Sequence, residues 1–239
     1  MKKITIIIAS LLFLVAAVRW MDNEHTVHLT TSKIDRFSYI ARYSGNANNT
    51  DYLPMLVALH GNGDTANNFY ETALNQIQKP ARIILLKGPI PYHRGDAWPI
   101  DADALSVYGE AVNEAIGILV DKYPTTGKPV LLGFSGGGVM AYYQSVIYGN
   151  NYSAIIPVSG KLTEAMLEGG DANSGAIVHA YHGRNDRVIS FSSGSHAVEI
   201  LKNRDINIKF TAFNGGHLGL FANAKSDITM TIEEALIQQ

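Results

Sequence analysis

The chain has 239 residues, of which 46% are hydrophobic and 17% are charged, and its formal net charge is −2. This composition is typical of a globular protein with one large core, and the near-neutral charge gives no reason to expect nucleic acid as a partner. The absence of cysteine excludes disulfide bonds, thiolate nucleophiles and Cys-ligated zinc.

The first twenty residues differ in kind from the rest. Lys2 and Lys3 precede the uncharged, mostly apolar run 4–18, which Arg19 closes. A charged start followed by a short apolar stretch resembles a secretory signal peptide, with a plausible cleavage point after Ala17.

We therefore expect residues 1–20 to be a signal peptide and residues 21–239 to form a single domain that is periplasmic or secreted. The alternative is an uncleaved N-terminal membrane anchor, although the 15 residues of 4–18 fall short of the roughly 20 that span a bilayer. Membrane contact is expected only through residues 1–20, if they are retained.

After the leader, short apolar runs alternate with amphipathic segments. The predicted strands are 37–43, 55–59, 83–86, 130–132, 154–158, 177–181 and 208–213, and the predicted helices include 104–122, 138–148 and 196–202. Apolar runs separated by helices favour an α/β fold with a mostly parallel, doubly wound sheet that helices cover on both faces. A hairpin is expected at its start, within 34–43.

A candidate nucleophile follows the strand 130–132. Ligands of such sheets bind beyond the carboxyl ends of the strands, so a catalytic residue should directly follow a strand. The stretch Gly133-Phe134-Ser135-Gly136-Gly137 reads G-x-S-x-G between that strand and the helix 138–148. In this context the serine sits on a strained turn that its glycine neighbours permit. Ser135 is therefore the predicted nucleophile.

A serine hydroxyl needs a base that takes its proton and an acid that orients the base. His217 follows the strand 208–213 through Asn214-Gly215-Gly216, and Asp186 follows the strand 177–181. Ser135, Asp186 and His217 stand in the chain order expected of an α/β-hydrolase.

Other histidines fit the role of the base less well. His182 ends a strand and is the serious rival, but it precedes the acid candidate. His179 is predicted inside a strand and His196 inside a helix, whereas His25 and His28 are too near the leader to join the edge of the main sheet.

The tetrahedral intermediate of an acyl transfer also needs hydrogen-bond donors for its negative oxygen. One donor is predicted to be the backbone N–H of Gly136, directly after the nucleophile. The other is predicted to be the backbone N–H of Asn62, in the loop after the strand 55–59. We expect His60 to hold that loop in shape.

Four motifs together resemble the phospholipase/carboxylesterase group of α/β-hydrolases, which includes acyl-thioesterases, from about residue 53 to 220. They are Leu59-His60-Gly61-x-Gly63-Asp64, Gly133-Phe134-Ser135-x-Gly137, His182-Gly183-x-x-Asp186 and Gly216-His217. The resemblance implies hydrolysis of small-molecule carboxylic esters or thioesters without a metal or an organic cofactor. We expect no large cap domain, because the short chain leaves little room for one.

The same resemblance suggests residues that contact substrate. Gly88-Pro89 and Ala97-Trp98 match a loop whose tryptophan lines the acyl site in this group. Trp98, Tyr92 and His93 are therefore candidates for substrate contact, and an aromatic plug over the core is the alternative for them.

The chain departs from the group at both predicted oxyanion positions. The group often has an apolar residue where Asn62 stands and glutamine where Gly136 stands. Because the backbone N–H groups act on the oxyanion, neither change should abolish the site. A more polar and less filled wall favours short or polar acyl groups over long lipid chains.

Several alternatives share this fold and chemistry, namely a thioesterase, a lactonase, a polyester depolymerase and a peptidase. A non-catalytic binding scaffold is a further alternative. The presence of all three candidate catalytic residues argues against it. The sequence predicts neither the physiological substrate nor the oligomeric state.

Overall fold

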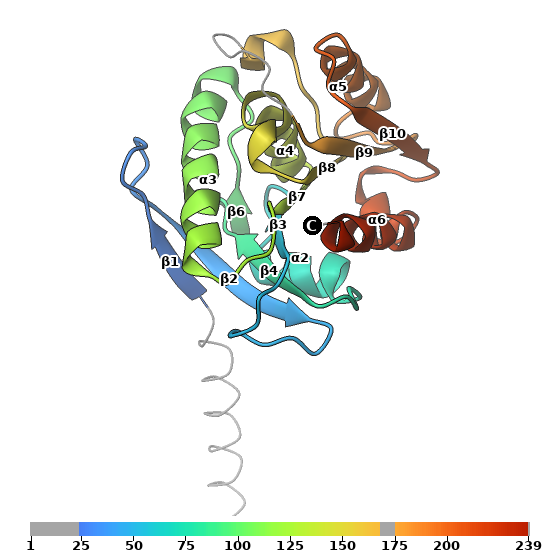
Figure 1. Cartoon of the computed structure of the whole chain (residues 1–239). Helices are drawn as coiled ribbons and strands as arrows, with labels where there is room; N and C mark the ends of the chain where they lie inside the picture. The colour runs from blue at the N-terminus through green and yellow to red at the C-terminus, as the bar shows by residue number, and fades with distance from the viewer. Residues whose placement is uncertain (1–23, 168–174, 239) are drawn as a thin grey trace, which may run out of the picture.

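One eight-stranded sheet organises the residues that the computed structural model describes, 24–167 and 175–238 (Figure 1). Its order is β1 (Glu24–His28), β2 (Arg36–Ser44), β4 (Ala81–Leu86), β3 (Met55–Leu59), β7 (Val130–Phe134), β8 (Ala154–Val158), β9 (Ile177–Gly183) and β10 (Ile208–Phe213). Strand β2 runs antiparallel to both of its neighbours, β1 and β4, and all other neighbouring pairs in this sheet are parallel. The predicted mostly parallel α/β sheet is confirmed. The predicted signal peptide, 1–20, lies outside the described residues.

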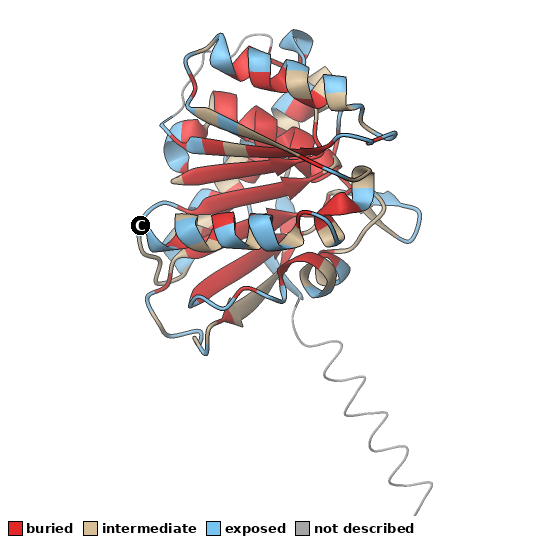
Figure 2. Cartoon of the chain, turned by 90° about the vertical axis from the view of Figure 1, so that its right-hand side faces the viewer, coloured by how far each residue is buried: buried red, intermediate tan, exposed pale blue. Residues whose placement is uncertain are grey.

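Helices cover both faces of this sheet. On one face lie α3 (Ala102–Lys122), α4 (Gly136–Ile147) and α5 (Phe191–Lys202), and on the other lie α2 (Ala66–Phe69), η1 (Tyr70–Leu74) and α6 (Lys225–Ile237). Strand residues alternate between the two faces. Met55 and Val57 of β3 therefore pack in the first core, and Leu56 and Ala58 in the second. Figure 2 shows the result, with buried strands between helices whose outer faces are exposed.

The N-terminal hairpin is larger than the sequence predicted. Strand β1 pairs with β2 from Glu24 opposite Ile40 to His28 opposite Arg36, so the hairpin does not begin within 34–43. His25 and His28 therefore do join the sheet, as part of an edge strand, which corrects the expectation that they lie outside it. The strand was missed because it is short and polar, and Val27 is its only buried residue.

The turn between β1 and β2 is fixed to α3 by Glu114. Its carboxylate accepts hydrogen bonds from the N–H groups of Thr30, Thr31 and Ser32. Desolvation raises the pKa of Glu114, but these hydrogen bonds outweigh it and lower the pKa from 4.5 to about 2. The stabilisation is therefore present above pH 4.5 and is lost as the pH falls towards 2.

We expect Glu114→Gln to lower the free energy of unfolding by about 1 kcal/mol at neutral pH, because an amide is a weaker acceptor than a carboxylate. Denaturant titrations should show this difference shrinking between pH 4.5 and pH 2. Glu110→Gln, on the same helix, is the matched control. A difference that stays constant with pH would contradict the assignment.

Candidate functional site

Ser135 lies on a tight turn between β7 and α4. Its φ of 54° and ψ of −114° are outside the regions that non-glycine residues usually adopt. The turn requires glycines around it, since a Cβ on Gly133 would lie 2.0 Å from the Gly137 oxygen. The Ser135 N–H donates to Val158 O at 2.9 Å and fixes the turn to β8. This holds the hydroxyl at the carboxyl edge of the sheet.

His217 bridges Ser135 and Asp186. Its Nε2 lies 2.8 Å from Ser135 Oγ, and its Nδ1 lies 2.8 Å from Asp186 Oδ2. A carboxylate only accepts hydrogen bonds, so Nδ1 carries the proton and, in the neutral ring, Nε2 accepts from the serine hydroxyl. The structure thus brings together all three residues that the sequence placed at strand ends.

The Asp186 side chain is fully buried, and its carboxylate accepts hydrogen bonds at both oxygens. Its Oδ1 accepts from the N–H groups of Val188 at 2.9 Å and Ile189 at 3.0 Å, while Oδ2 accepts from His217. These bonds fix the carboxylate plane. Asp186 can therefore hold the His217 ring in one orientation and one tautomer.

The rival histidine, His182, lies on the other side of this carboxylate, and among the hydrogen bonds of the described residues none joins it to Ser135. Its Nε2 donates to Ile189 O at 2.9 Å and lies 3.4 Å from Asp186 Oδ2. Burial lowers the pKa of His182 more than the Ile189 carbonyl and Asp186 raise it, so the ring is neutral. The contact between His182 and Asp186 was not predicted from the sequence, although the two residues are only four positions apart.

The loop after β3 runs beside Ser135. A Cβ built on Gly61 would lie 3.4 Å from the Ser135 Cβ. Among the hydrogen bonds of the described residues, none uses the backbone N–H of Asn62 or of Gly136. Two unused donors therefore stand next to the serine, on the two residues predicted to form the oxyanion hole.

His60 holds this loop as expected. Its Nδ1 donates to Gly61 O at 2.8 Å, and its Nε2 accepts from the Gly88 N–H at 3.0 Å. The ring is fully buried, and burial lowers its pKa. His60 thus joins the end of β3 to the end of β4 as a neutral imidazole.

An open cleft of about 410 Å³ adjoins Ser135 and His217. Its lining includes the polar residues Asn62, Asp64, Asn68 and Thr72 and the apolar residues Phe134, Leu218 and Phe221. Most of these were not named as substrate-lining from the sequence. They could have been found from the expectation that functional residues follow the carboxyl ends of strands, because they follow β3 or β10 or precede the serine.

The three residues predicted to contact substrate lie outside this lining. The Trp98 side chain is packed in the core, 1% exposed, with its ring 6.2 Å from that of Phe37. Tyr92, the last residue of β5 (Ile90–Tyr92), is exposed. Its ring lies 4.3 Å from that of His93, which is in the turn to β6 (Gly95–Ala97). Substrate contact by Tyr92 and His93 stays a prediction. The buried Trp98 ring has the position expected of an aromatic plug over the core.

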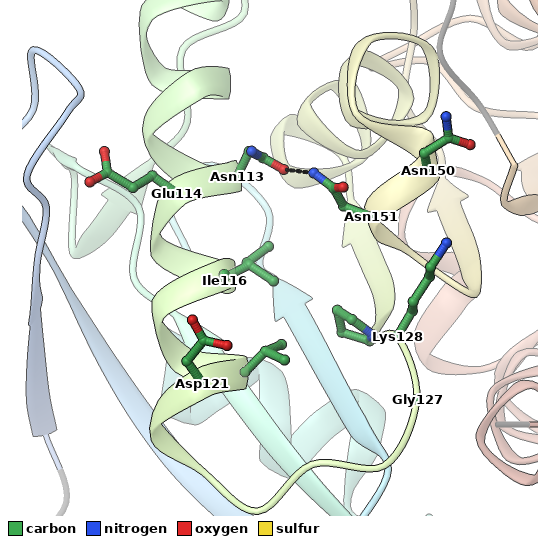
Figure 3. A pocket seen from close by; sticks show the side chains of 11 residues that line it. Asn113, Glu114, Ile116, Asp121, Gly127, Lys128, Asn150 and Asn151 are labelled. Carbon is green, nitrogen blue, oxygen red and sulfur yellow. Dashed lines mark hydrogen bonds between the residues drawn. The ribbon is translucent and has the colours of Figure 1, made fainter.

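A second cleft lies at the opposite, amino edge of the sheet, between α3 and the segments that precede β7 and β8 (Figure 3). Asn151 Nδ2 donates to Asn113 Oδ1 across it at 2.8 Å.

Within 24–167 and 175–238, no group of three or more His, Cys, Asp or Glu could hold a metal ion. No helix in the same residues is long and apolar enough to cross a membrane.

The buried histidines make the fold sensitive to acid. Burial lowers the pKa of His60 and of His182 below 6.5. Below pH 6.5 these two histidines therefore bind protons in the unfolded chain before they do so in the folded protein. Stability is therefore highest above about pH 6.5 and falls below it, by up to about 1.4 kcal/mol per pH unit for each histidine. Unfolding titrations between pH 7 and 5 should show a smaller slope for His60→Asn. The exposed His196→Asn is the control, and equal slopes for His60→Asn and the parent would contradict this.

The chain is similar to known proteins in sequence and in structure. Residues 101–220, half of the chain, match the family model of phospholipase/carboxylesterase. None of the curated proteins matches the chain. A carboxylesterase of Bacillus cereus is 18% identical, with a TM-score of 0.66 over 83% of this chain and 94% of that chain.

Two plant proteins have the same fold. SOBER1 of Arabidopsis thaliana is 19% identical, with a TM-score of 0.64 over 77% of this chain and 98% of its own. Acyl-protein thioesterase 2 of Zea mays is 18% identical, with a TM-score of 0.64 over 83% and 98%. Identities this low show the fold alone, and they confirm the fold expected from the sequence.

Proposed function

The chain belongs to the phospholipase/carboxylesterase family of α/β-hydrolases, and we propose that it is a serine hydrolase that cleaves carboxylic esters through an acyl-serine intermediate. The observation that supports this most is the continuous hydrogen-bonded path from Ser135 through His217 to Asp186. Ser135 stands at the open cleft, beside two backbone N–H groups, of Asn62 and Gly136, that no hydrogen bond among the described residues uses.

In the proposed mechanism, Ser135 Oγ attacks the ester carbonyl carbon while its proton passes to His217 Nε2. Asp186 stabilises the imidazolium and holds its Nδ1–H. The carbonyl oxygen becomes an oxyanion that accepts hydrogen bonds from the N–H groups of Asn62 and Gly136. The C–O bond to the alcohol breaks, and the alcohol leaves with the proton from His217. Water, deprotonated by His217, then attacks the acyl carbon. The bond from that carbon to Ser135 Oγ breaks, Oγ takes the proton back from His217, and the carboxylic acid leaves.

The cleft favours short or polar acyl groups. Asp64, Asn68 and Thr72 add polar groups to a mostly apolar lining, and the cleft is open to solvent rather than a closed apolar channel. Each CH₂ group of an acyl chain gains about 0.8 kcal/mol only where it is buried. A long chain would leave much of that gain unused here.

A series of nitrophenyl esters and acyl thioesters of increasing chain length tests this proposal, with Ser135→Ala as the control. We expect the highest kcat/KM for short chains. A maximum above about ten carbons would contradict the short-acyl preference. Since one structural neighbour is an acyl-protein thioesterase, the comparison of esters with thioesters decides between these two bonds.

We also propose that the protein is exported, on the charge and apolar pattern of residues 1–20. The mass of the mature protein tests this, because cleavage after Ala17 would remove 17 residues. A full-length protein held in the membrane fraction would favour the N-terminal anchor instead.

A further inference from the structure

The Asn62 side chain pairs with the main chain of Trp98. Its Oδ1 accepts the Trp98 N–H at 2.8 Å, and its Nδ2 donates to Trp98 O at 3.1 Å. Such a two-point pairing needs an acceptor and a donor side by side, as a carboxamide provides. Both polar ends of this amide are therefore engaged within the protein, which changes the sequence-based picture of Asn62 as a free polar wall.

The same loop is fixed to β6 by two main-chain hydrogen bonds. The Gly63 N–H donates to Asp96 O at 2.9 Å, and the Asp96 N–H donates to Asp64 O at 2.9 Å. The backbone N–H of Asn62 takes part in none of these bonds. The loop is thus held directly after that N–H, which stays available to a substrate oxygen.

The Asn62 amide also packs against Gly136. A Cβ on Gly136 would lie 2.1 Å from Asn62 Oδ1 and 2.5 Å from its Cγ, far inside van der Waals contact. The amide therefore fills the space that any larger residue at position 136 would need. The Asn62 amide thus contacts Gly136, whose backbone N–H is the second predicted oxyanion donor.

We propose that the Asn62 side chain is a positioning residue, which clamps Trp98 and packs on Gly136 and so fixes the two N–H donors of the oxyanion hole relative to each other. This inference rests on the proposed function. Because the donors bind the oxyanion of the transition state more strongly than the ester carbonyl, the clamp acts on kcat rather than on KM.

Asn62→Ala removes both hydrogen bonds to Trp98 and keeps the backbone N–H. We expect kcat to fall by about 10- to 100-fold, since a misplacement of about 1 Å can cost 10²-fold, while KM changes by less than about threefold. Asn151→Ala is the matched control, because it removes an amide hydrogen bond to Asn113 at the opposite edge of the sheet. An unchanged kcat in Asn62→Ala would overturn the proposal.

Gly136→Ala provides a second, independent perturbation. Its Cβ would displace the Asn62 amide from Trp98, so kcat should fall about as far as in Asn62→Ala. In the Asn62→Ala background the space is vacant, and Gly136→Ala should then cost no further activity. The double variant should therefore match Asn62→Ala alone, whereas independent, additive losses would contradict a shared clamp.

Hydrogen exchange of the Trp98 amide tests the clamp without any substrate. Loss of its acceptor should speed exchange at least about tenfold in Asn62→Ala and leave it unchanged in Asn151→Ala. Equal protection in Asn62→Ala and the parent would show that the clamp does not exist.

The two proposals fail in different ways. If the parent has no turnover that depends on Ser135, the proposed function is wrong and the positioning role falls with it, while hydrogen exchange still decides whether the clamp forms. If the parent is active and Asn62→Ala exchanges faster but keeps its kcat, only the positioning role is wrong.

Discussion

Ser135→Ala is expected to lower kcat for short-chain esters by a factor of about 10⁴ to 10⁶, because its hydroxyl, paired with His217, is the group that forms the acyl intermediate. The path from Ser135 Oγ to Asp186 through His217 has two bonds of 2.8 Å each. KM should change little, because the alanine leaves the cleft and both backbone donors in place. Covalent labelling by a fluorophosphonate probe should disappear in parallel.

The other two residues should behave as parts of one unit with the serine. Asp186→Asn should lower kcat by about 10⁴-fold, since an amide can hold the wrong His217 tautomer. Ser135→Ala combined with His217→Ala should be no worse than Ser135→Ala alone. Ser106→Ala, on the exposed side of α3, is the control. Labelling and turnover that survive in Ser135→Ala would disprove the mechanism and revive the non-catalytic scaffold.

Much of the fold could be predicted from the sequence because its central strands are buried on both faces. Strands such as β3, β7 and β8 consist entirely of buried residues, and they read as unbroken apolar runs. Edge strand β1 has no such run. Helix α6 was not among the predicted helices, and within its amphipathic pattern only four of thirteen residues are buried. Packing against the sheet, rather than a strong local signal, determines such elements.

The candidate catalytic residues could be predicted for a related reason. Parallel strands end at one edge, so Ser135, Asp186 and His217 meet although 82 residues separate the first from the last. The environment of Trp98 and the contact between Asn62 and Gly136 could not be predicted. Both depend on how loops from different strands pack against each other, and no local pattern in the sequence records that packing.

At the opposite edge of the sheet, Arg82 is a fully buried cation. Its Nη1 donates to Pro124 O at 2.8 Å, and its Nη2 donates to the carbonyl oxygens of Asn49 at 3.3 Å and Asp51 at 3.2 Å. Its guanidinium lies 4.8 Å from the ring centroid of Tyr123. No carboxylate among the described residues forms an ion pair with it. Arg82 therefore joins two loops through their carbonyl groups and an aromatic face.

Two effects of replacing Arg82 oppose each other. Removing the charge removes a desolvation cost, but it also leaves the carbonyl oxygens of Asn49 and Asp51 without their donor, whereas the Pro124 oxygen still accepts from the Leu53 N–H. Arg82→Met roughly keeps the volume, and we expect the lost hydrogen bonds to win and lower the free energy of unfolding by about 2 kcal/mol. Arg82→Ala adds a cavity and should cost about 4 kcal/mol. Denaturant titrations should thus rank Arg82→Ala below Arg82→Met, and both below the exposed control Arg36→Met, which should stay within about 0.5 kcal/mol of the parent. Full stability in Arg82→Met would mean that the desolvation of the buried charge cancels its hydrogen bonds, and that packing alone joins the two loops.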